Sequence, residues 1–196
     1  MAVGTGFSHL LVALYSNEGS TITHTGMARL GRSVNISLEV ETADDNSFYA
    51  DNEVAESVNG IFTGGSGTAT VDGVDPAVAR MIWGLAQTRD VTVGSDSVAV
   101  QGYGASEPPY VTIGYIYRTM MNGVTAYVPT VITKAKFGMP SSEYNTQEED
   151  IEWQTQELSF TFYRDDTDAH EWKYEATTGY ASEDGAIAFL EAMLGA

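Results

Sequence analysis

The chain has 196 residues, of which 43% are hydrophobic and 18% charged, which predicts a folded domain with a sizeable apolar core. Its net charge is −18, so its surface should repel a nucleic-acid backbone rather than bind it. The absence of cysteine excludes disulfides and thiolate metal sites. No apolar run approaches the roughly 20 residues of a membrane helix, and residues 1–14 lack the regions of a secretion signal. We therefore expect a soluble protein without membrane contact.

After an extended amino-terminal segment, residues 1–33, the clearest strand covers residues 34–41. Apolar and polar residues alternate there with a period of two, which is typical of a strand buried on one face. The apolar positions, expected in the core, are Val34, Ile36, Leu38 and Val40, and the polar positions are Asn35, Ser37, Glu39 and Glu41. In the loop segment 42–60 that follows, Asp44, Asp45 and Asn46 form a polar loop and Phe48 to Asn52 are expected to be extended.

Residues 61–74 resemble a further strand, and Gly64, Gly65 and Gly67 predict a flexible or bulged middle. Asp75 followed by Pro76 predicts the start of a short helix, because an Asp carboxylate caps free amides and proline fits the first turn. The apolar stripe of this helix consists of Val78, Met81, Ile82 and Leu85. We expect that stripe to cover an end or face of a sheet.

Residues 110–137 predict a long β-hairpin, because Asn122-Gly123 accepts the positive φ angles of a tight turn between two strand patterns. Pro129 removes one backbone donor and should lie at a bulge or edge. Further strand patterns cover residues 151–163 and 170–178. Ser182 predicts the cap of a final helix, residues 182–194, whose apolar face carries Ile187, Leu190, Met193 and Leu194. The chain therefore predicts a single domain, mainly β with minor α.

Signatures of chemistry are weak in this sequence. The Gly64–Gly67 run comes nearest to a nucleophile turn but is better explained as a strand or turn. Asp165, Asp166, Asp168 and His170 include oxygen ligands at alternate positions, yet a solvated turn explains them better than a calcium site. Trp83, Trp153 and Trp172 are candidates for a sugar-stacking surface, although strand aromatics more often pack in cores. We assign no catalytic, cofactor or metal residue and expect no enzyme.

Several stretches together resemble the major tail proteins of long-tailed, non-contractile bacteriophages. The resemblance covers much of the chain and depends on the order and spacing of its pieces. They are Tyr49-Ala50-Asp51 with Glu53 and Glu56, Val71 to Pro76 running on to Ile82-Trp83-Gly84, Pro109-Tyr110-Val111, Gly114-Tyr115, Asn122-Gly123, Lys134, Phe137, Pro140, Asn145-Thr146 and Ile151 to Thr155. The chain departs from that family in its amino-terminal segment and in acidic residues 165–171.

This resemblance implies a β-sandwich or barrel of the tail-tube type, flanked by a short helix and with a carboxy-terminal helix. It implies six subunits in a ring, with rings stacked into a hollow tube in the virion after assembly in the host cytoplasm. The implied partners are other copies of the chain, the tape-measure protein, and tail terminator and initiator proteins. DNA passes through without specific binding, and no cofactor is implied.

A tube that confines DNA without gripping it should have a negative inner wall. We therefore hypothesise that Glu39 and Glu41, with Asp72 on a neighbouring strand, face the channel. The loop 42–60 is the candidate for contacts between rings or subunits, because it mixes carboxylates with aromatic residues. Its interface candidates are Asp44, Asp45, Phe48, Tyr49, Asp51, Glu53 and Glu56. Three alternatives remain open, namely the inner tube of a contractile tail or secretion system, a carbohydrate-binding β-sandwich and, ranked last, a hydrolase.

Overall fold

The computed structural model describes residues 3–44, 46–50, 53–58, 60–104, 107–141 and 154–195, with the backbone alone in 46–50 and 53–58. The elements in chain order are β1 (Val3–Glu18), β2 (Thr21–Arg29), β3 (Ser33–Thr42), β4 (Asn46–Ala50), β5 (Glu53–Val58), β6 (Phe62–Val71), α1 (Pro76–Trp83), β7 (Arg89–Val93), β8 (Asp96–Val100), β9 (Val111–Met121), β10 (Val124–Phe137), β11 (Gln156–Tyr163), β12 (Lys173–Glu175) and α2 (Glu183–Met193). The predicted fold class, mainly β with minor α, is confirmed.

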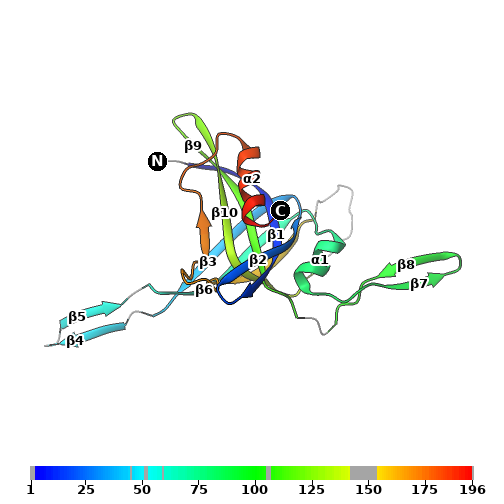
Figure 1. Ribbon diagram of the computed structural model, residues 1–196, viewed down its shortest axis with the longest axis horizontal. Helices are drawn as coiled ribbons and strands as arrows, with labels where there is room; N and C mark the ends of the chain where they lie inside the picture. Colours follow the sequence, from blue (N-terminus) through cyan, green and yellow to red (C-terminus); the bar gives the residue numbers. More distant parts are fainter. Residues whose placement is uncertain are drawn as a thin grey trace.

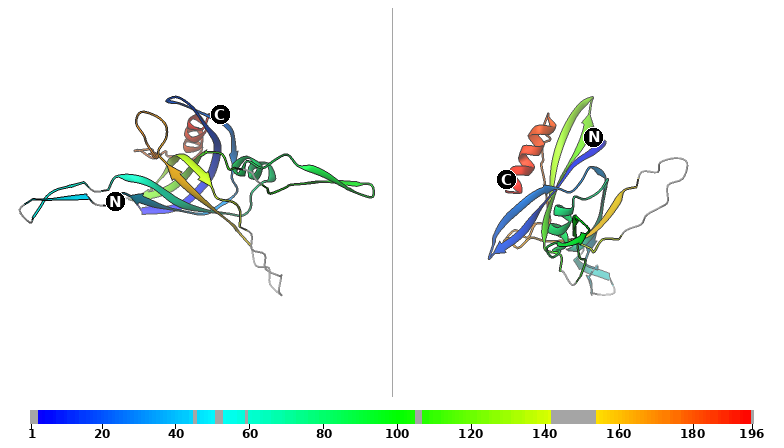
Figure 2. Two further views of the ribbon diagram at one scale, coloured as in Figure 1. Left: turned by 90° about the horizontal axis from the view of Figure 1, so that it is seen from below. Right: turned by 90° about the vertical axis from the view of Figure 1, so that its right-hand side faces the viewer.

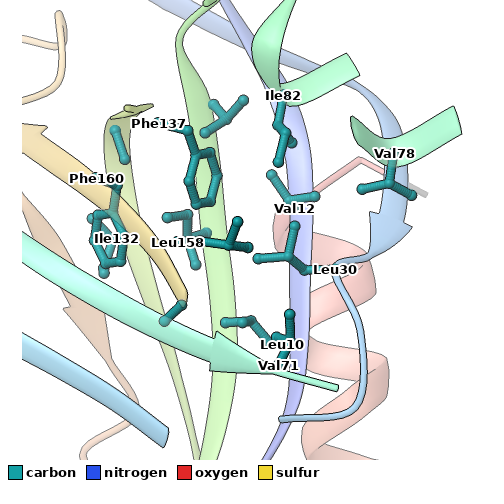
Figure 3. Close-up of a cluster of buried hydrophobic side chains, with 14 of the residues drawn as sticks. Leu10, Val12, Leu30, Val71, Val78, Ile82, Ile132, Phe137, Leu158 and Phe160 are labelled. Carbon is teal, nitrogen blue, oxygen red and sulfur yellow. The ribbon is translucent and has the colours of Figure 1, made fainter. Parts of the chain in front are cut away.

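One antiparallel sheet forms the body, in the order β2-β1-β9-β10-β11-β6-β3, with β12 paired to β10. The sheet folds over on itself, so side chains of β1, β9 and β10 meet those of β11, β6 and β3 in one core. Figure 3 shows Val12 of β1, Ile132 of β10 and Leu158 of β11 in this cluster. Strand β10 links the two halves, because it pairs with β9 and, at its carboxy-terminal end, with β11.

Helix α1 packs against the core where the predicted stripe requires. Asp75 caps it by accepting a hydrogen bond from the Ala77 amide at 2.8 Å, which confirms the predicted start. Val78 and Ile82 are buried, and both point into the core in Figure 3. Trp83 donates from Nε1 to the Gly138 carbonyl at 2.8 Å, which fixes the end of the helix beside the end of β10.

Helix α2 covers the opposite surface of the half-sheet formed by β1, β9 and β10. Ser182 caps it through the Gly185 amide, as predicted. Its buried residues Leu190 and Leu194 lie against Gly114 of β9, where an added Cβ would stand 3.0 Å from Leu194. The body therefore has a helix on the outer surface of this half-sheet, and the right-hand view of Figure 2 shows α2 beside its strands.

The predicted hairpin 110–137 is confirmed as β9 and β10, with φ of 52° at Asn122 and 79° at Gly123. Pro129 lies inside β10, and its carbonyl accepts a hydrogen bond from the Ala176 amide just beyond the end of β12. Its missing N–H therefore faces the side of the short strand β12 and leaves the pairing with β9 intact. The amino-terminal segment differs from the expectation. Residues 3–29 form the hairpin β1–β2, and β1 is an inner strand of the sheet rather than a separate extended segment.

The strand prediction for residues 34–41 is correct, but its core assignment is partly wrong. Ile36 and Leu38 pack against the core as expected. Val34 is 57% exposed because it is the extra residue of a bulge between Ser33 and Asn35. Val40 is 45% exposed on β3, which is the edge strand of the sheet.

Two hairpin arms project from the body in opposite directions. One is the β4–β5 pair, in the loop segment 42–60 where only Phe48 to Asn52 were expected to be extended, and the other is the β7–β8 pair. Figure 1 shows them at the two ends of the longest axis, and Figure 2 confirms that separation from a second direction. Each arm is a two-stranded sheet of its own, hydrogen-bonded to no strand of the body among the described residues.

Candidate functional site

The outer surface of β3, β6 and β11 is polar and carries no helix. Ser37 pairs with Thr68 and Thr68 with Ser159, so these side chains share one face of the sheet. The full set, which we call the polar face, is Asn35, Ser37, Glu39 and Glu41 of β3, Ser66, Thr68 and Thr70 of β6, and Glu157, Ser159, Thr161 and Tyr163 of β11. Helix α1 packs on the core side of these strands and α2 on the other half-sheet. The polar face is therefore left open.

The glycine run, from which flexibility was predicted, instead makes room for two aromatic rings that pack beneath the polar face. Gly65 lies opposite Phe162 and Gly67 opposite Phe160, and both aromatic rings are buried on the core side. A Cβ on Gly67 would stand 2.4 Å from the Phe160 ring, and one on Gly65 would stand 2.2 Å from the Phe162 ring. The expectation of a flexible or bulged segment is wrong, because β6 pairs regularly with β11 along this stretch.

The electrostatic balance of the polar face is negative. Glu39, Glu41 and Glu157 are exposed and, within the described residues, take part in no ion pair. Lys136, which lies opposite Thr161, contacts Glu107 at 2.8 Å, and this hydrogen bond lowers the pKa of the Glu107 carboxyl. The nearby basic side chain is thus already neutralised. A shallow concavity of about 750 Å³ follows the centre of the face.

Of the three lumen candidates, the structure brings Glu39 and Glu41 together on the polar face but not Asp72. Asp72 follows β6 at the other end of the β3–β6 pair, roughly 23 Å away along the strand. Its carboxylate accepts hydrogen bonds from the backbone amide and Nε of Arg32 at 2.7 and 2.5 Å. The backbone bond contributes most to lowering the pKa of Asp72. Asp72 therefore fixes the turn between β2 and β3, and its assignment to the channel wall stays a prediction.

The interface candidates concentrate on the β4–β5 arm. Phe48 and Tyr49 lie in β4, and Glu53 and Glu56 lie in β5, where Phe48 pairs with Glu56. Asp44 precedes the arm and is exposed. Asp45 and Asp51 lie outside the described residues. The segment 44–58 contains five carboxylates and no basic residue, so this arm is acidic.

No strands were predicted from the sequence for the β7–β8 arm. Val91 pairs with Val98, and alternation places Val93 and Val100 on the same side of the ribbon. Val91, Val93 and Val98 are 40%, 72% and 59% exposed, so this apolar side is uncovered in the single chain. The signal was the alternation Val-Thr-Val before Gly94 and Val-Ala-Val after it, a short hairpin pattern.

At the base of the β7–β8 arm lies a second concavity, of about 800 Å³, which we call the cup. Helix α1, the end of β8 and the segments around 103 and 139 enclose it. Its lining includes Arg80 and Trp83 of α1, Tyr103 and Met139. Tyr103 and Met139 are 58% and 48% exposed, and the Tyr103 ring lies 6.4 Å from that of Trp83. The cup therefore combines apolar and polar lining, with an arginine in its wall.

The acidic turn at Asp165–His170 is not the solvated turn that was expected. Asp165 is only 3% exposed, and its Oδ1 accepts hydrogen bonds from the Thr167 amide and hydroxyl. Asp166 contacts Lys134 at 2.7 Å and Tyr15 at 2.7 Å. Burial and the hydrogen bond to Asp166 raise the pKa of Tyr15 to about 12, while the hydrogen bond from Lys134 lowers the pKa of Asp166. The Asp165 carboxylate thus stabilises the turn from within, and Asp166 anchors the turn to the sheet.

Other signatures considered in the sequence have structural roles. Trp83 is 2% exposed, and Trp172 stacks on Phe62 and Phe162 at 5.3 Å each, so neither presents an open platform for a sugar. Trp153 lies outside the described residues. Within the described ranges, no three His, Asp or Glu side chains are grouped as metal ligands. Neither described helix has the length and apolar character needed to cross a membrane.

No protein-family model matches this chain, and a search of curated proteins finds no relative. The polar face, the two arms and the cup are therefore the features of this chain from which a function can be inferred.

Proposed function

We propose that this chain is the structural subunit of a phage tail tube, in which hexameric rings stack around a channel for DNA. The observation that carries the proposal is the polar face, an open sheet surface of hydroxyl and carboxylate side chains on a protein of net charge −18. Hydroxyl groups hydrate the wall, and the carboxylates repel phosphate. Such a surface suits the passage of DNA without binding.

Unpaired strand edges support assembly with other copies. Among the described strands, β2 pairs only with β1 and β3 only with β6, so each presents one free edge. Free edges favour pairing with another chain, and closure into a ring removes them. Pairing of β3 with an edge of the neighbouring subunit would extend the polar face around the channel.

The first test is negative-stain electron microscopy of the purified protein at rising concentration, with and without the tail initiator complex. Rings or hollow tubes are expected. A protein that stays a single particle under all these conditions would refute the proposal. Tubes that purify with a surrounding sheath would favour the contractile-tail or secretion-system inner tube over the non-contractile tail.

The second test reverses the charge of the wall with Glu39→Lys and Glu41→Lys. Because both side chains are exposed and unpaired, rings should still form, but DNA ejection from the assembled particles should slow as lysines attract phosphate. Glu18→Lys, an exposed carboxylate at the end of β1, is the matched control and should leave ejection unchanged. Equal ejection rates for both variants would remove the polar face from the channel wall.

A further inference from the structure

The cup at the base of the β7–β8 arm has the chemistry of a docking site. Its volume of about 800 Å³ lies in the range of pockets that enclose a small ligand, so it has room for more than one side chain. Tyr103 and Met139 supply exposed apolar surface, the buried Trp83 ring supports Tyr103 from behind, and Arg80 supplies positive charge. Arg80 has no carboxylate partner in the described chain, and neither has Arg89, which begins β7 next to the cup-lining Thr88. An acidic hairpin with aromatic residues would match these features.

This chain carries such a hairpin at its other end. The β4–β5 arm and its approach, residues 44–58, contain five carboxylates, no basic residue, and the aromatic residues Phe48 and Tyr49. Figures 1 and 2 show that this arm and the β7–β8 arm, at whose base the cup lies, point away from each other. The arm therefore cannot reach the cup of its own chain, whereas it can reach the cup of another copy.

We propose that the cup binds the β4–β5 arm of a second copy, so that subunits join head to tail through an acidic arm and an arginine-containing cup. This contact rests on the proposed function and names the receiving surface for the arm. Because arm and cup are different surfaces, the contact is heterologous, and each added copy presents a new arm and a new cup. Such a contact propagates rather than closing as a dimer.

The contact can be tested by reversing the charge of the cup in one variant and of the arm in another, and then mixing the two variants. In one variant Arg80→Glu makes the cup repel the arm. In the other, Asp51→Lys, Glu53→Lys and Glu56→Lys change the net charge of residues 44–58 from −5 to +1, so that the arm repels the cup. Each variant alone should need at least about tenfold more protein than the wild type to assemble, because like charges then face each other. An equimolar mixture should assemble near the wild-type concentration, since each arm finds a cup of opposite charge. Sedimentation velocity measures all three samples.

Arg118→Glu is the matched control, because Arg118 also lacks a carboxylate partner among the described residues but lies on the inner strand β9 and does not line the cup. It should assemble as the wild type does. Arg80 also lies in the last turn of α1, where a positive charge stabilises the helix, so thermal unfolding must be followed for each variant. Rescue in the mixture would exclude misfolding as the cause of lost assembly.

The outcomes separate this contact from the tube itself. Hollow tubes from Arg80→Glu at the wild-type concentration, or a mixture that fails to assemble, would overturn the cup contact and leave the tube proposal standing. Open chains that depend on Arg80 without any hollow tube would retain the contact and overturn the tube. A wild-type protein that remains monomeric even with the initiator complex would overturn both.

Discussion

The body and the two arms differ in what holds them together. In the body, residues from both halves of the sheet and from α1 share one core, with Leu10, Val71 and Ile82 fully buried. The β7–β8 arm has no such support, since its valine side is exposed and its strands pair only with each other. An isolated two-stranded hairpin is only marginally stable in water. The body therefore has a complete core in the single chain, and only its strand edges stay open, whereas the arms have a form that a partner would complete.

The largest expected effect breaks the body. Phe160→Ala should lower the free energy of unfolding by about 3–5 kcal/mol, because the ring is 2% exposed and its removal leaves a cavity in the shared core. Val93→Ala on the arm, where the side chain is 72% exposed, should change it by less than about 0.5 kcal/mol. Urea denaturation of both variants gives the comparison. Similar losses for the two would mean that the arm belongs to the same cooperative unit as the body.

A smaller effect is expected where β6 approaches the aromatic rings. Gly67→Ala should cost about 1–3 kcal/mol of unfolding free energy, because the added methyl would meet Phe160 at 2.4 Å and the Ser37 carbonyl at 2.9 Å. Gly4→Ala in β1 is the control, since an added Cβ there meets nothing within 4 Å. Chemical denaturation measures both variants. A Gly67→Ala variant as stable as the wild type would show that the sheet adjusts freely, contrary to the close fit described above.

The next effect concerns the anchored turn at Asp166. Asp166→Asn should lower the free energy of unfolding by about 1–2 kcal/mol at neutral pH, because a charged hydrogen bond to Lys134 is lost. Lys134 lowers the pKa of Asp166 in the folded state, so the stabilisation is present above the unfolded pKa of about 4 and is lost as the pH falls through the folded pKa. Denaturation at neutral and acid pH measures this.

The variant should therefore lose less stability than the wild type on acidification. Asp168→Asn, in the same turn but without a hydrogen bond or ion pair among the described residues, is the control. A wild type and an Asp166→Asn variant with parallel pH profiles would remove this carboxylate from the acid response.

The sequence predicted best those elements whose signals are local. Asp75 and Ser182 cap helices through amides two or three residues away, and Asn122-Gly123 sets its own turn. The polar side of β3 also follows from its own alternation, which placed Glu39 and Glu41 correctly on one face. Each of these features depends on neighbours in the chain, so a single sequence is enough to find them.

The errors concern contacts between residues far apart in the chain. Gly67 packs against Phe160 of the neighbouring strand β11, a contact that the local sequence does not reveal. The glycines were therefore interpreted as a flexible segment, although the packing of the rings requires them. Asp72 was grouped with Glu39 by charge, and its hydrogen bonds to Arg32 on another turn were not predicted. The bulge at Val34 depends on the register with β6, which alternation alone does not reveal. The cup combines α1, β8 and segments near 103 and 139, so no local motif marks it.

The smallest effect on stability is expected at the β7–β8 arm. Val91→Thr with Val98→Thr should change the free energy of unfolding by less than about 0.5 kcal/mol, because both side chains are exposed and threonine retains the branched shape that strands favour. If the valine side packs against another copy, the same pair of changes should weaken assembly, since two buried methyl groups become hydroxyls there. Thr92→Val with Ser97→Val, which alters the opposite side of the ribbon, is the control and should not weaken it. Unfolding and sedimentation measured on the same samples separate the two roles. An assembly concentration unchanged by the valine substitutions would mean that this side of the arm stays in solvent, and that the β4–β5 arm and the cup join the copies without it.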